Sequence, residues 1–203
     1  MTLTSTSIQD GQPIHPTFAL GRPSGFDEAA VFNVSPHLAW DDVPPVTRSF
    51  VVACIDPDAP ADGSDAGKPG VTIPENAPRT DFVHWVLYDI PAGRRALNEG
   101  EDSVGQTVGG KDAQTKAYGV RGQNDYTGWF AGDPTLGGTY HGYDGPYPPP
   151  NDERTHRYVF TVYALGTDTL GLGPGAAWKD VEAAMAGRVL EHASIQGTYT
   201  LNL

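Results

Sequence analysis

The sequence predicts a mainly β protein with few helices, and three apolar segments carry that prediction. Residues 48–55 (RSFVVACI), 82–90 (FVHWVLYDI) and 156–165 (HRYVFTVYAL) are rich in β-branched and aromatic residues, which favour strands. The last two are apolar on both alternating faces, as in central strands that are covered on each side. The 25 glycines and 18 prolines indicate many turns.

Two C-terminal segments add further elements. Residues 176–193 have apolar side chains at helical spacing, from Trp178 to Val189, which predicts an amphipathic helix packed on the sheet. Residues 197–203 (GTYTLNL) alternate and predict a strand with one polar face. No internal repeat or low-complexity stretch divides the chain, so we expect residues 1–203 to form one domain.

Two long segments have no periodic pattern. Residues 60–81 contain four prolines, and residues 119–155 are rich in glycine and proline. Loops of this length are uncommon in compact domains and are usually functional or disordered. The second segment holds six Tyr, Trp and Phe side chains, too many for a disordered linker. We therefore expect it to fold back and pack.

The composition argues against several classes of partner. A formal charge of −12 disfavours nucleic acid, which needs clustered Lys and Arg, and is repelled by an anionic membrane surface. The single cysteine, Cys54, cannot form an intramolecular disulfide, which favours a reducing compartment. The sequence shows neither a signal peptide nor an apolar stretch near the roughly 20 residues of a membrane span. We expect a cytoplasmic protein.

A histidine interrupts the second apolar segment. Strand alternation places His84 on one face with Phe82, Val86 and Tyr88, so the imidazole should be at least partly buried. A buried imidazole needs hydrogen-bond partners. Taken alone, His84 is best explained as a core histidine bound to a carbonyl group.

Two other strands supply further polar groups. His156 begins the third apolar segment with Tyr158 on the same face, and Asp56 directly follows the first segment. A carboxylate on one imidazole nitrogen fixes the tautomer and raises the basicity of the ring. An imidazolium beside a Tyr hydroxyl forms a small anion pocket, and this interpretation competes with a purely structural one.

The segment GYDGPYPPP (142–150) is compatible with such a pocket. Gly145 allows backbone to approach a ligand closely. Pro148, Pro149 and Pro150 hold the chain in an extended polyproline-like form, as a stiff wall. A recognition motif for a protein partner, or simply a rigid loop, explains the segment equally well on its own.

Metal binding and catalysis are less favoured alternatives. The spacing of Asp56, His84 and His156 matches no local metal motif, although two His and one carboxylate on strands can form a facial triad. There is no G-x-S-x-G elbow, and Cys54 is expected to be buried and inert. We therefore predict no catalytic residue, metal or cofactor.

Taken together, these segments resemble the phosphatidylethanolamine-binding protein family, also called Raf-kinase-inhibitor-like proteins, in its bacterial branch. The resemblance covers most of the chain, and the combination D-P-D-A-P, H-W and H-R-Y is specific. The matching stretches follow the order of the family: SPHLAW (35–40), SFVVACIDPDAP (49–60), HWVLYDIP (84–91), GYDGPYPPP (142–150) and THRYVFTVYAL (155–165).

The resemblance implies a large antiparallel sheet packed on a smaller one, with a few flanking helices. It also implies a pocket for phosphate-like anions, including phospholipid head groups, in which Asp56 orients His84 and both histidines donate to the anion. The implied ligand-binding residues are Asp56, His84, His156, Tyr158, Gly145 and Pro148, and the residues that support the surrounding loops are Asp58, Pro60 and Tyr147.

Three departures from the family pattern affect the size of the ligand. Tyr147 stands where animal members have a glycine, and residues 61–81 and 127–141 resemble insertions that cap the site. The predicted function is non-enzymatic binding of a phosphate-like anion or phospholipid head group, in a regulatory role. The alternative is an inhibitor of a kinase or protease that acts through a protein–protein interface. The sequence leaves a homodimer open.

Overall fold

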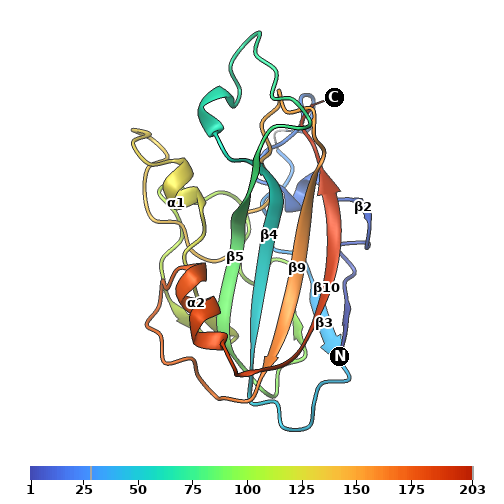
Figure 1. Ribbon diagram of the computed structural model, residues 1–203, viewed down its shortest axis with the longest axis vertical. Helices are drawn as coiled ribbons and strands as arrows, with labels where there is room; N and C mark the ends of the chain where they lie inside the picture. Colours follow the sequence, from blue (N-terminus) through green and yellow to red (C-terminus); the bar gives the residue numbers. More distant parts are fainter. Residues whose placement is uncertain (28, 203) are drawn as a thin grey trace.

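Three long strands form the centre of the larger sheet: β4 (Ser49–Pro60), β5 (Arg79–Pro91) and β9 (His156–Leu165). They correspond to the three segments predicted as strands, of which the first, 48–55, begins one residue before β4. The computed structural model describes residues 1–27 and 29–202. In it, seven strands follow the order β2-β10-β9-β4-β5-β8-β7, and three more form a second sheet in the order β1-β3-β6 (Figure 1).

The other elements are mostly short. Within the sheets, only β2 and β10 pair in parallel among the described residues. The remaining bounds are β1 (Thr2–Thr4), β2 (Gln12–Pro13), β3 (Leu38–Asp41), β6 (Ala96–Leu97), β7 (Thr115–Lys116), β8 (Gly119–Arg121) and β10 (Val189–Tyr199), with the 3-10 helices η1 (Pro16–Phe18) and η2 (Gly63–Asp65) and the α-helices α1 (Tyr126–Trp129) and α2 (Trp178–Met185).

The two faces of the larger sheet bury different apolar clusters. One face packs on the smaller sheet, where the Trp40 and Phe50 ring centroids lie 5.3 Å apart. The opposite face is covered by α2, whose Val181 and Met185 pack on β5 and its neighbours. Each central strand is therefore buried on both sides, which accounts for its two-sided apolar pattern. A large antiparallel sheet on a smaller one, with few helices, is the predicted fold.

The predicted helix over 176–193 is wrong in its second half. Helix α2 ends at Met185, Gly187 adopts a left-handed conformation (φ 73°), and the chain continues as β10. Strand β10 pairs with β9 along its whole length. This long-range pairing outweighs the local helical spacing of the apolar residues. The predicted C-terminal strand is present only up to Tyr199, and residue 203 lies outside the described residues.

Both long punctuated segments are structured. The first contains η2 and joins β5 at Arg79. The second contains β8 and α1, and most of its aromatic side chains are buried, as expected: Tyr126, Phe130, Tyr140 and Tyr143. In the part of the chain that the structure describes, no helix combines the length and apolar character that crossing a membrane requires.

Candidate functional site

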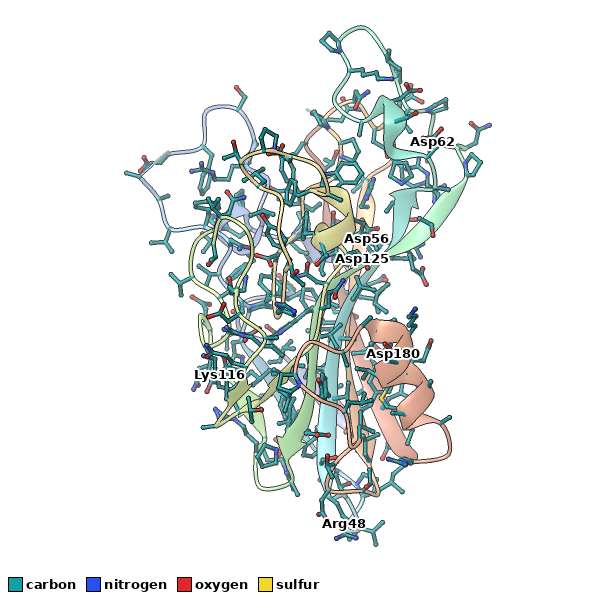
Figure 2. The ribbon with its side chains drawn as sticks, turned by 90° about the vertical axis from the view of Figure 1, so that its left-hand side faces the viewer. Arg48, Asp56, Asp62, Lys116, Asp125 and Asp180 are labelled. Atoms are coloured by element: carbon teal, nitrogen blue, oxygen red, sulfur yellow. The ribbon has the colours of Figure 1, made fainter. Side chains whose placement is uncertain are left out.

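A cavity of about 210 Å³ lies where β4, β5 and β9 approach α1 and the loop after β4. Figure 2 shows Asp56 beside the base of α1, with Asp62 farther out on that loop. The cavity is lined by Asp56, Ala59, Pro60, Ala61, Gly63, Phe82, His84, Tyr126, Trp129, Tyr147, Pro148, Pro149, His156 and Tyr158.

A β-bulge directs His84 into this cavity. Cys54 lies opposite Trp85 and Ile55 opposite Val83, so His84 is an extra residue between two paired positions. Its ring contacts those of Phe82 and Tyr158, with centroids 4.9 and 5.1 Å away.

The bulge also changes the face that His84 occupies. Val86 and Tyr88 pack beneath α2, whereas Tyr158 belongs to the cluster on the opposite face of the sheet. The expectation that His84 shares a face with Val86 and Tyr88 is therefore wrong. In a regular strand, successive side chains point to opposite faces of the sheet. One inserted residue shifts this alternation, so that the residues before the bulge point to the opposite faces from those that the pattern after the bulge would predict.

The hydrogen bond of His84 defines its tautomer. Its Nδ1 lies 2.9 Å from the carbonyl oxygen of Asp144, which can only accept, so Nδ1 carries a proton. In the neutral ring Nε2 is then an acceptor. Burial lowers the pKa of His84, and this outweighs the opposing effects of the Asp56 charge and the Asp144 hydrogen bond. The ring is therefore neutral near pH 7.

His156 is held between two carboxylates. Its Nδ1 lies 2.7 Å from Asp56 Oδ2, and its Nε2 lies 3.1 Å from Asp152 Oδ2. Asp56 therefore orients His156, and not His84 as expected. Both ring nitrogens of His156 are engaged, so neither is left to donate to a ligand, contrary to the expected role.

The charges around His156 alternate in sign. Arg79 donates to Asp152, with Nη2 3.0 Å from Oδ1. Burial alone lowers the pKa of His156, but hydrogen bonds to Asp56 and Asp152 and the charges of these carboxylates raise it overall. When His156 is protonated, the series Arg79, Asp152, His156 and Asp56 therefore carries two positive and two negative charges.

Tyr158 supplies a polar atom without a partner. The side chain is fully buried, lines the cavity, and its hydroxyl makes no hydrogen bond to any residue that the structure describes. Burial, followed by the charge of Asp56, raises the pKa of Tyr158 well above its ordinary value. The hydroxyl therefore stays protonated near neutral pH and can donate a hydrogen bond. Unpaired buried polar atoms are rare in folded proteins and call for an explanation.

Four further predicted residues differ in their relation to the cavity. Pro60, Tyr147 and Pro148 line it. Asp58 does not, and its carboxylate accepts hydrogen bonds from Arg154 and Arg157. These bonds and charges hold its pKa well below the usual range, although burial opposes them. Asp58 thus ties the end of β4 to the start of β9, in the supporting role expected for it.

Gly145 lies behind the cavity wall and does not line it. Its N–H donates to Asn33 Oδ1 at 2.8 Å, and its carbonyl accepts from the Tyr126 hydroxyl at 2.7 Å. A Cβ at this position would lie 2.0 Å from the Phe18 carbonyl oxygen. Glycine is therefore required by backbone packing, and not by approach to a ligand.

We expect Gly145→Ala to destabilise the protein by about 1–3 kcal/mol, because the added carbon forces two backbone segments apart. Urea unfolding measures this, with Gly93→Ala as the control, since a Cβ on Gly93 meets no atom within 4 Å. Equal unfolding midpoints for the two variants would contradict this account of Gly145.

The two segments that resemble insertions meet at the cavity. Ala61 and Gly63 line it from the first, and Trp129 lines it from the second. A Cβ on Gly63 would lie 2.7 Å from the Trp129 ring, so the segments are in close contact. Trp129 and Tyr147 remain 42% and 45% exposed at the mouth of the cavity.

Several residues around the site escape prediction from sequence. Asp152 and Arg79 lie in loop or strand-end positions, and only their contacts with His156 and with each other reveal their role. Phe82, Tyr126 and Trp129 form apolar walls of the cavity. For Tyr126 and Trp129, the sequence signal is the concentration of aromatic residues in 119–155.

A model of the family described as phosphatidylethanolamine-binding protein matches residues 4–200 of the chain. The chain belongs to this family. It is 34% identical over 200 residues to the UPF0098 protein YbhB of Escherichia coli, covering 98% of this chain and 100% of YbhB. A UPF0098 protein of Aquifex aeolicus is 38% identical over 167 residues, which are 82% of this chain and 74% of the relative.

Solved structures of the phosphatidylethanolamine-binding protein family share the fold. The crystal structure of Escherichia coli YbcL, described as a new member of the mammalian PEBP family, superposes with a TM-score of 0.68. It is 26% identical in sequence, and the match covers 98% of this chain and 96% of YbcL. The resemblance seen in the sequence is therefore confirmed for the family and for the fold.

Proposed function

We propose that the cavity binds a phosphate-like anion, free or as the head group of a phospholipid, and that the protein acts by binding and not by catalysis. The observation that carries the proposal is the Tyr158 hydroxyl, which is buried and protonated and has no hydrogen-bond partner among the described residues. It belongs to a side chain that lines the cavity, with its ring centroid 5.1 Å from that of His84. A phosphate oxygen is a suitable acceptor for this hydroxyl.

Proton uptake by His84 supplies the positive charge for an anion. With His156 protonated, the charges of Arg79, Asp152, His156 and Asp56 cancel, so positive charge for an anion has to come from protonation of His84 Nε2. The charges of Asp56 and Asp125 favour that protonation, and burial opposes it. An anion then accepts hydrogen bonds from Nε2 and from Tyr158. The apolar walls exclude water and strengthen both bonds.

A binding role without catalysis is supported by the lack of an activated nucleophile. Cys54 is fully buried, and burial raises the pKa of its thiol well above the ordinary value, so no thiolate forms near neutral pH. In the part of the chain that the structure describes, no group of three His, Cys, Asp or Glu side chains is placed to hold a metal.

Anion affinity is expected to increase as the pH falls, by up to about tenfold per pH unit, until the lowered pKa of free His84 is reached. Above that pKa the free ring of His84 is neutral, so each anion that binds requires the uptake of one proton by His84. Titrations with phosphate and phosphoethanolamine between pH 5 and 7.5, followed by NMR of His84 and Tyr158, measure the change. Sulfate, whose own charge is constant over this range, separates protonation of the protein from that of the ligand.

The control for this titration is a second histidine on the same sheet. We expect His84→Ala to abolish the binding, and His192→Ala on β10 to leave it unchanged, because His192 packs on Tyr163 away from the cavity. Saturable binding that survives in His84→Ala, or that strengthens as the pH rises, contradicts the proposed site.

A further inference from the structure

Asp144, the acid in GYDGPYPPP, forms two hydrogen bonds with His84. Its N–H donates to the main-chain carbonyl of His84 at 3.0 Å, and its own main-chain carbonyl accepts from His84 Nδ1 at 2.9 Å. Asp144 is almost fully buried and does not line the cavity. The backbone of Asp144 therefore holds both the main chain and the ring of His84 from outside the cavity.

The Asp144 carboxylate is held by donors from three other segments of the chain. Its Oδ1 accepts from Lys111 Nζ at 2.7 Å and from Asn33 Nδ2 at 2.9 Å, and its Oδ2 accepts from Asn124 Nδ2 at 2.9 Å. All three donors belong to buried or nearly buried side chains. We call these four residues the Asp144 clamp. The carboxylate cannot turn without leaving buried polar groups unpaired, so the carbonyl that contacts His84 is fixed as well.

We propose that the Asp144 clamp couples anion binding to proton uptake, by holding the neutral ring of His84 in the tautomer whose Nε2 cannot donate. The inference rests on the proposed anion site and assigns the residues that regulate it. A ring free to change tautomer would place its one proton on Nε2 and donate to an anion without taking up a proton. The clamp prevents this change, because the Nδ1 lone pair would then face the carbonyl oxygen of Asp144, and two buried acceptors would share no proton.

The other groups around the His84 ring act on its charge and not on its tautomer. The titratable side chains there are Asp56 on β4, Asp125 and Tyr126 at the start of α1, and His156 and Tyr158 on β9. The charges of Asp56 and Asp125 favour the protonated ring, and burial opposes it. Burial keeps both tyrosine hydroxyls protonated. These groups set the pH at which the ring takes up a proton, whereas the clamp decides that binding requires one.

Calorimetric titration with sulfate in buffers of different ionisation enthalpy counts the protons taken up with each anion. Above the lowered pKa of His84, wild type is expected to take up about one proton per sulfate, so that affinity falls about tenfold per pH unit. Lys111→Met loosens the clamp, and the double variant Asp144→Asn/Lys111→Met loosens it without changing the net charge. Both should take up less than one proton, with a fall in affinity of less than about threefold per pH unit.

Lys116→Met is the control for the lost positive charge. Lys116 donates to Gln114 and lies well away from Asp56 and Asp125 (Figure 2), and this variant should keep the proton count of wild type. If the clamp acted only through charge, Lys111→Met would shift the pH at which the proton is taken up, and the charge-balanced double variant would behave as wild type does.

The tautomer of His84 in wild type tests the inference without any substitution in the buried clamp. Nitrogen NMR of the neutral ring, at a pH above its pKa, should find the proton on Nδ1. A proton on Nε2 overturns the role of the clamp, and so does a folded double variant that still takes up one proton per sulfate. Either result leaves the anion site intact. Failure of sulfate to bind wild type at any pH overturns the anion site itself.

Discussion

Tyr158→Phe is expected to weaken phosphate binding roughly 10- to 100-fold without destabilising the protein. The hydroxyl makes no hydrogen bond to any described residue, so its removal breaks none of those contacts. A buried unsatisfied hydroxyl costs about 1–3 kcal/mol, and the variant should therefore be as stable as wild type or more stable. A bound anion loses a charge-assisted hydrogen bond worth about 1.5–3 kcal/mol.

The matched control is Tyr143→Phe. Tyr143 is equally buried, but its hydroxyl donates to the Phe18 carbonyl oxygen and it does not line the cavity. This variant should lose stability and keep its affinity for phosphate. Calorimetric titration and urea unfolding of both variants measure the two quantities. If Tyr158→Phe binds phosphate as wild type does, the hydroxyl is not a ligand contact and the proposed function loses its main support.

His156→Leu should reduce the free energy of unfolding by about 3–5 kcal/mol. The substitution removes the positive ring between Asp56 and Asp152, and both carboxylates are almost fully buried. Breaking a buried ion pair on one side leaves an uncompensated charge, which is the costly case. Arg79 still pairs with Asp152, so most of the loss arises at Asp56.

The pH dependence of unfolding identifies the origin of this loss. The folded protein raises the pKa of His156, so its contribution to stability is complete below the ordinary histidine value near 6.5 and is lost as the pH rises through the higher folded value. His84, whose pKa is lowered, contributes with the opposite sign in both proteins. The difference between wild type and His156→Leu should therefore shrink as the pH rises. A difference that is constant from pH 5 to 9 would show that the loss comes from packing alone.

The central strands could be predicted because burial on both faces of the sheet requires apolar residues at nearly every position of a strand. The segments later found in β4, β5 and β9 are apolar at nearly every position. The strand β10 lacks such an apolar pattern, since most of its residues are exposed or only partly buried and its partner β9 is not adjacent to it in the sequence. Local spacing therefore predicted a helix where long-range pairing produced a strand.

The sequence predicts which residues line the site better than it predicts which of them contact each other. Asp56, His84, His156 and Tyr158 all line one cavity. Their pairing depends on the bulge at His84, which no local pattern records, and on Asp152, whose position in an irregular loop gave no signal of its contact with His156.

The pairing of β4 with β9 has a consequence for refolding kinetics. Asp56 and His156 are 100 residues apart in the chain, yet their strands are neighbours at the centre of the sheet. Closing so long a loop is entropically unfavourable until many contacts form together, which makes such pairings late events. The proposed phosphate binding should therefore return only with the slowest structural phase, so that a binding signal would report the completed chain topology and not the early collapse.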